Sequence, residues 1–139
     1  MATIWQQAEE LKDEMVERRR DLHRHPETGW TEFRTASMII GELKNLGYDV
    51  KFGDDVIDEK SMMGVPSEAE LADYMQRAIS EGADPELVKK MAGGKTGIVA
   101  TLKTDKPGKT VAFRFDMDCN DVEEDTGAEH RPQQEGFNS

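Results

Sequence analysis

Hydrophobic residues recur at helical spacing along the first 25 residues of the chain. They follow one another at steps of four, three, four and seven, which places them on one face of a helix. The residues on this face are Ile4, Ala8, Leu11, Met15 and Leu22. Because Pro26 disfavours helical backbone in the residue before it, we expect the helix to end near His25.

A second helix is expected after a turn at residues 28–31. Thr31 can cap its amino end, and Glu32 suits the positive end of the helix dipole. Gly47 is a natural stop, since glycine adopts the left-handed cap conformation without strain. The buried stripe of this helix should contain Phe33, Ala36, Ile40 and Leu43.

Two further helices have clear start signals. Ser67 and Glu70 form a capping box, in which each side chain satisfies a free backbone N–H at the helix start. Asp84 followed by Pro85 supplies a capping side chain and a proline at the first helical position, and that helix should end at Gly93 and Gly94.

Three short strands are expected. Residues 48–52 alternate between apolar and polar, as do residues 98–102 and 111–115. The turn signal at residues 105–108 predicts that the last two strands form an antiparallel hairpin. We therefore expect an α/β fold, with helices packed on a small mixed sheet, as the amino-terminal part of a larger catalytic domain.

Residues 116–139 show no apolar periodicity and are strongly acidic, which predicts a loop that is ordered only by a partner. The acidic residues are Asp116, Asp118, Asp121, Glu123, Glu124, Asp125, Glu129 and Glu135. We interpret residues 1–139 as one partial domain that ends in this acidic loop.

Charge and cysteine content exclude several classes of protein. The chain has 18 Lys and Arg against 29 Asp and Glu, a formal charge of −11, so it repels phosphate backbones and nucleic-acid binding is not expected. The single cysteine, Cys119, excludes an internal disulfide and favours a cytoplasmic location. No apolar run reaches the length of a signal-peptide core or a membrane span, so no membrane partner is expected.

The candidate chemistry lies in Asp116 and Asp118, which follow the last expected strand. Ligands gather beyond the carboxyl ends of strands in α/β folds, and two neighbouring carboxylates favour a cation or a shared proton. A solvent-facing acidic turn is the alternative. An EF-hand is excluded, because its glycine position holds Asp121 and its final glutamate position holds Gly127. The acidic surroundings of Cys119 disfavour a thiolate, so a packing role is expected for it.

Several segments in one order resemble the zinc aminoacylase and carboxypeptidase superfamily of metal-dependent amidohydrolases, and within it the aminobenzoyl-glutamate utilisation subgroup. The segments are residues 19–27, 32–36, 63–66, 97–102, 112–118, 130–132 and 136–137. The resemblance implies hydrolysis of an amide bond between an acyl group and an amino acid, with aminobenzoyl-glutamate and related folate fragments as the expected substrate class. It also implies a pair of divalent metal ions, zinc or manganese, held by residues that lie beyond Ser139, so that this chain holds no metal ligands.

The resemblance also assigns roles to residues of this chain. Asp118 matches an aspartate that orients metal ligands from outside the coordination sphere, and Asp116 plays a weaker version of that role. Four matching residues are read as structural: His23, Pro26, Glu27 and Glu32. Residues 119–121 depart from the subgroup pattern, which has a small residue after the second aspartate.

The expected partner is the remainder of the enzyme or a homologous subunit, and the chain should be inactive by itself. The alternative is a non-catalytic binding or regulatory module derived from the same family.

Overall fold

The computed structural model describes residues 2–139, which form two compact units. The larger unit is Glu27–Asn120. The smaller unit combines the chain up to Pro26 with Asp121–Ser139. Its two pieces come from opposite ends of the sequence, an association that hydrophobic patterning alone does not predict.

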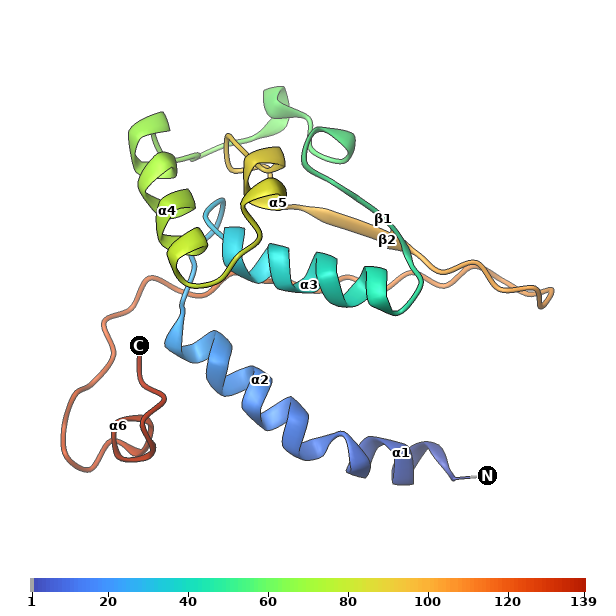
Figure 1. The fold of residues 1–139 in the computed structure, drawn as a ribbon, viewed down its shortest axis with the longest axis horizontal. Coiled ribbons are helices and arrows are strands. Elements are labelled where there is room, and N and C mark those ends of the chain that lie inside the picture. The colour runs from blue at the N-terminus through green and yellow to red at the C-terminus, as the bar shows by residue number, and fades with distance from the viewer. Residues whose placement is uncertain (1) are drawn as a thin grey trace. The chain divides into compact units, whose positions relative to one another are not determined.

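The larger unit is built around one helix, α3 (Phe33–Asn45), which packs against every regular helix and strand of that unit (Figure 1). These elements are β1 (Asp49–Phe52), α4 (Glu68–Ser80), α5 (Pro85–Lys90) and β2 (Ile98–Thr101). Two 3-10 turns, Gly53–Asp55 and Glu59–Ser61, lie between β1 and α4. The α/β class predicted from the sequence is confirmed.

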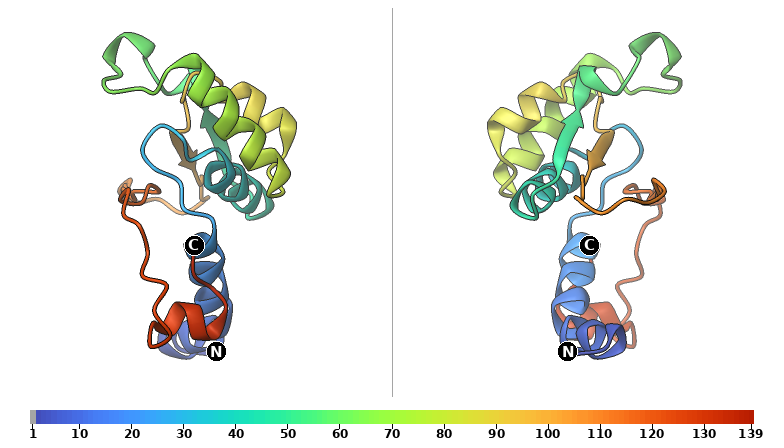
Figure 2. Two further views of the ribbon diagram at one scale, coloured as in Figure 1. Left: turned by 90° about the vertical axis from the view of Figure 1, so that its left-hand side faces the viewer. Right: turned by 90° about the vertical axis from the view of Figure 1, so that its right-hand side faces the viewer.

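The sheet of the larger unit consists of β1 and β2, which pair antiparallel with Asp49 opposite Thr101 and Phe52 opposite Ile98. Figure 2 shows the two strands, in green and orange, beside α3. Phe52 and Ile98 face the core, whereas Val99 faces outward and is 52% exposed. Alternate side chains therefore bury one face of the sheet under α3, as the period of two requires.

The core of the larger unit is a single cluster of apolar side chains contributed mainly by α3, α4 and α5. Phe33, Ile40, Val88 and Met91 are completely buried in it. The other buried members are Ala36, Leu71, Ala78 and Ala83. Ile40 and Phe33 confirm the buried stripe expected for the second helix.

The predicted hairpin of residues 98–102 and 111–115 is wrong. β2 pairs with β1, 46 or more residues earlier in the chain, and residues 111–115 are extended without a strand partner. Phe113 and Phe115 stack on each other at 6.3 Å between ring centroids, but remain 78% and 82% exposed. Pairing this segment with β2 would bury little apolar surface against the entropy cost of ordering it.

Local start signals for the later helices are confirmed. Ser67 and Glu70 make the reciprocal capping box at the start of α4. The Asp84 side chain accepts a hydrogen bond from the backbone N–H of Glu86, with Pro85 opening α5. These signals work because donor and acceptor lie within three residues of each other in sequence.

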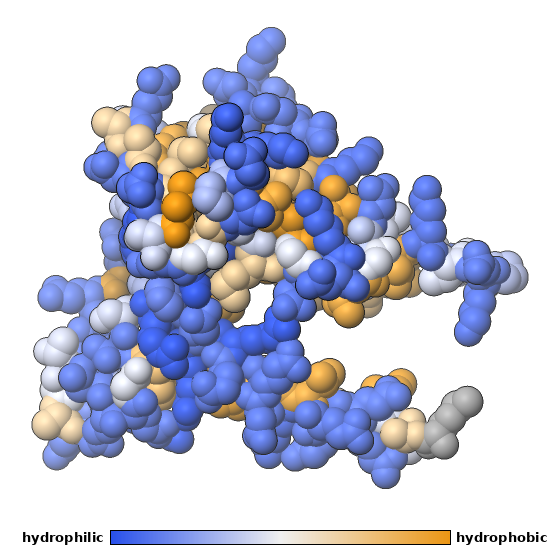
Figure 3. Space-filling model, in the orientation of Figure 1, coloured by the Kyte–Doolittle hydropathy of each residue, from blue (hydrophilic) through white to orange (hydrophobic). Residues whose placement is uncertain are grey.

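The smaller unit contains α1 (Ile4–Glu10), α2 (Lys12–Arg24) and α6 (Arg131–Glu135). The sequence pattern predicts one helix up to His25; the structure ends α2 there but breaks the helix at Leu11. The expected apolar stripe is largely exposed, with Ile4 at 82% and Met15 at 62%. Hydrophobic residues, coloured orange, accordingly appear at the surface in Figure 3. Within the expected acidic loop, α6 is a short helix opened by Arg131 and Pro132.

Candidate functional site at the amino end of α3

Glu27 holds the amino end of α3 from outside the helix. Its two carboxylate oxygens accept hydrogen bonds from the backbone N–H groups of Arg34 and Thr35, each at 2.8 Å. These are free amides of the first helical turn, where the helix dipole favours negative charge. The sequence pattern predicts the capping role for Thr31, whose hydroxyl instead donates to the carbonyl of Thr28 at 2.8 Å. That expectation is corrected: a carboxylate seven residues away caps the helix.

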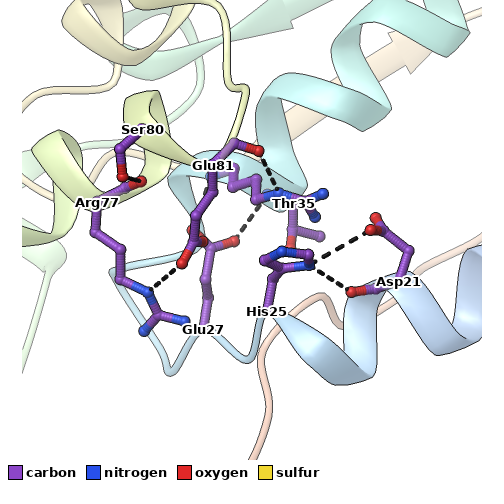
Figure 4. Close-up of polar contacts among 8 residues, drawn as sticks. Asp21, His25, Glu27, Thr35, Arg77, Ser80 and Glu81 are labelled. Carbon is purple, nitrogen blue, oxygen red and sulfur yellow. Dashed lines mark hydrogen bonds and ion pairs between the residues drawn. The ribbon is translucent and has the colours of Figure 1, made fainter. Parts of the chain in front are cut away.

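Around this helix end, side chains connect α3 to the carboxyl end of α4 (Figure 4). The Arg34 Nε–H donates to the carbonyl of Glu81 at 3.1 Å, and the Arg77 Nε–H donates to the Glu81 carboxylate at 3.0 Å. Ser37 links α3 to the start of α5, because its hydroxyl accepts from the backbone N–H of Asp84 at 3.0 Å. The start of α3 is thus fixed on two sides by polar contacts that are buried or partly buried.

Glu32 is a buried carboxyl group next to this helix end, only 8% exposed. The Thr96 hydroxyl, two residues before β2, donates to it at 2.6 Å. Burial raises the pKa of Glu32, the hydrogen bond from Thr96 opposes that shift, and the negative charges of Asp118 and Glu27 add to it. The negative charge of Asp118 is therefore one of the causes, after burial, of the raised pKa of Glu32.

We expect Glu32→Gln to change the pH dependence of stability. A carboxyl group whose pKa is raised in the folded state stabilises that state at pH values below its ordinary pKa of 4.5. This stabilisation is lost as the pH rises through the pKa of the folded state. Glutamine has no charge to desolvate and retains an acceptor for Thr96. Urea unfolding of both proteins between pH 4.5 and 7 should show the variant gaining stability relative to the wild type as the pH rises. If the difference in unfolding free energy between the variant and the wild type does not vary with pH, the raised pKa of Glu32 is contradicted.

Asp118 lies beside the turn that leads into α3. The backbone N–H of the next residue, Cys119, donates to the carbonyl of Glu27 at 2.9 Å. A Cβ atom on Gly29 would come within 4.0 Å of the Asp118 carboxylate. Asp118 is exposed, while the preceding Met117 packs against the core cluster. The extended segment is therefore anchored at the point where it presents Asp118.

Asp116 does not join Asp118 in a common site. Its carboxylate pairs with the guanidinium of Arg114 at 2.8 Å, and both side chains are largely exposed. The expectation that the two carboxylates extend from the end of a paired strand is wrong for this reason: the segment is not in the sheet.

The sequence-derived residues thus separate into two places. The larger unit brings together Glu27, Glu32 and Asp118. His23 belongs to the smaller unit, where its ring contacts Glu124, and the half-buried Pro26 ends that unit's first piece. Sequence reasoning missed Thr96, which lies 64 residues from its partner Glu32 and has no local signal.

Across residues 2–139, no group of three or more His, Cys, Asp or Glu side chains has an arrangement that could hold a metal ion. Over the same residues, no helix combines the length and apolarity that a membrane crossing demands.

Comparison with known proteins gives close relatives. The chain is 51% identical over 130 residues to an indole-3-acetyl-aspartic acid hydrolase of Enterobacter agglomerans, covering 94% of this chain and 30% of that protein. It is 42% identical over all 139 residues to a p-aminobenzoyl-glutamate hydrolase subunit of Escherichia coli, covering 32% of that protein. No protein-family model matches the chain.

A solved structure agrees with these sequence matches. The crystal structure of an aminobenzoyl-glutamate utilization protein from Klebsiella pneumoniae matches 86% of this chain with a TM-score of 0.82 and 45% identity. The match covers 30% of that chain. Sequence and fold together show that this chain is similar to one segment of each of these longer proteins. Two of the matched proteins bear names that refer to aminobenzoyl-glutamate and one is named for an indole-acetyl conjugate of aspartate, which confirms the resemblance found in the sequence. The chain spans about 30% of the length of these relatives.

Proposed function

We propose that this chain is the amino-terminal portion of a binuclear metal amidohydrolase that cleaves the amide bond of an N-acyl amino acid, with aminobenzoyl-glutamate as the favoured substrate. The observation that carries the proposal is identity of 42% over the whole chain to a p-aminobenzoyl-glutamate hydrolase subunit. The 45% identity and TM-score of 0.82 to an aminobenzoyl-glutamate utilization protein support the same substrate class. The single cysteine favours a cytoplasmic location.

In this proposal, Asp118 is a positioning residue for metal ligands that lie in sequence beyond Ser139. A bound zinc or manganese pair would polarise the substrate carbonyl and activate water. The proposal assigns no metal-bound step to residues 2–139. Their part is to hold an exposed carboxylate in place: Glu27 anchors the backbone next to Asp118, and Glu27 also fixes the start of α3.

We expect the purified 139-residue chain to show no hydrolysis of aminobenzoyl-glutamate with added zinc or manganese. Product release would be followed by chromatography of the freed aminobenzoate, after mass spectrometry has verified the chain. An intact relative, such as the E. coli hydrolase, serves as the positive control. Turnover by the verified chain above the rate of a buffer blank refutes the proposal that essential residues lie elsewhere.

A second candidate is a non-catalytic module that binds a related intact homologue. It is favoured by the exposed apolar side chains of residues 111–115, which a partner could cover. Co-purification separates the two candidates: stable pairing of this chain with an intact homologue, without a gain in that homologue's activity, favours the module.

A further inference from the structure

Residues 121–139 are attached to α2 by a polar cluster that the amidohydrolase role does not use. At its centre is Glu124, whose side chain is 14% exposed. The Nε2–H groups of His23 and His130 both donate to the same oxygen of Glu124, each at 2.7 Å. The other oxygen accepts from the backbone N–H of Ser139 at 2.6 Å and from its hydroxyl at 2.8 Å. We call His23, Glu124 and His130 the histidine latch.

An aromatic contact lies next to the histidine latch. The Phe137 side chain, at 7% exposed, is a buried apolar residue of the smaller unit. The ring of His23 meets it edge-on, with centroids 5.5 Å apart. The guanidinium of Arg20 lies over the same ring at 4.7 Å. Two residues from one turn of α2 therefore contact Phe137: the imidazole of His23 at its edge and the guanidinium of Arg20 over its face.

Other charged groups face the histidine latch from each neighbouring element. On α2, Arg20 pairs with Glu17 at 3.5 Å. Arg20 also pairs across to Glu135 on α6 at 2.5 Å, and Glu135 in turn pairs with Arg131. Each of these four groups has an oppositely charged partner, whereas Glu124 is the carboxylate that contacts both imidazoles.

We propose that the histidine latch fastens residues 121–139 onto α2, and that loss of the Glu124 charge releases this segment. Glu124 makes four contacts that reach three separate parts of the smaller unit: α2, the turn before α6, and Ser139. Hydrogen bonds to an ionised acceptor are about twice as strong as neutral ones, so one carboxylate contributes to all of these attachments at once.

The hydrogen bonds from His130, Ser139 and His23 lower the pKa of Glu124 well below its ordinary value of 4.5. A carboxylate whose pKa is lowered in the folded state stabilises that state at pH values above its ordinary pKa. This stabilisation is lost as the pH falls through the pKa of the folded state. The histidine latch is therefore closed near neutral pH and opens in strong acid.

The experiment is amide hydrogen exchange on the full 139-residue chain at pH 7, comparing the wild type, Glu124→Gln and the control Glu123→Gln, which removes a charge from an exposed neighbour. In Glu124→Gln, exchange of the amides of residues 131–139 should accelerate about ten-fold, since charged hydrogen bonds become neutral ones. Amides of α3 in the larger unit should be unchanged. Equal exchange in the two variants overturns the proposal.

A measurement on the wild type keeps the test independent of how the variants fold. The ring protons of His23 and Phe137 should show a nuclear Overhauser effect at pH 7, and His25, whose ring contacts the carbonyl of Asp21 at 2.8 Å within α2, should show none to Phe137. Absence of the His23–Phe137 effect in the wild type overturns the proposal whatever the variants do.

Discussion

Replacement of Glu27 by alanine should destabilise the larger unit by about 3 kcal/mol. The substitution removes two hydrogen bonds of 2.8 Å to the amides of Arg34 and Thr35 and leaves both buried donors without their acceptor. An unsatisfied buried donor costs roughly 1–3 kcal/mol, and loss of a helix cap costs about 1 kcal/mol. The two effects overlap here, because the same amides are involved in both.

Urea unfolding monitored by fluorescence measures this loss. Trp30 lies in the larger unit, with its indole N–H donating to the carbonyl of Met63 at 2.9 Å, so a Trp5→Phe background leaves one reporter in that unit. The control Asp73→Ala removes an exposed carboxylate from α4 and should change the stability by less than about 0.5 kcal/mol. Equal midpoints for Glu27→Ala and Asp73→Ala would contradict the capping role.

The second large effect concerns activity, and it requires a complete enzyme. We suggest a chimera in which residues 1–139 replace the matching segment of the E. coli hydrolase subunit, which aligns over the whole chain. In that chimera, Asp118→Asn should lower kcat about 10- to 100-fold, the range typical of residues that orient metal ligands. KM should change little, since Asp118 is not assigned a contact with substrate.

Two neighbouring aspartates serve as matched controls for Asp118→Asn. Asp116→Asn should have a smaller effect, because Asp116 is engaged with Arg114. Asp121→Asn should have none, since Asp121 is exposed and lies outside the larger unit. If all three variants retain the same kcat, Asp118 has no positioning role.

The sequence predicts local structure well and distant pairing poorly in this chain. The start of α4 at Ser67 and the end of α2 before Pro26 depend on groups a few residues apart, and both predictions are confirmed. The partner of β2 lies about fifty residues away, so the prediction that favours the nearer segment, residues 111–115, is wrong. Alternation identifies a strand-like segment but carries no information on which edge it joins.

The candidate site divides in the same way. The order of the sequence motifs identifies Asp118, whereas its proximity to Glu32 depends on the fold. The capping role of Glu27 is hidden in the sequence because its acceptor atoms reach seven and eight residues along the chain rather than the usual two or three. The pairing of Glu124 with His23 joins residues 101 apart, for which the sequence offers no periodic signal.

The most direct test of the central claim is the rate of p-aminobenzoyl-glutamate hydrolysis by the chimera, assembled as the parent E. coli enzyme is and loaded with manganese or zinc. The account predicts that residues 1–139 support turnover within about ten-fold of the parent enzyme, given 42% identity over the exchanged segment. A chimera that folds and assembles like the parent but shows no turnover would contradict it.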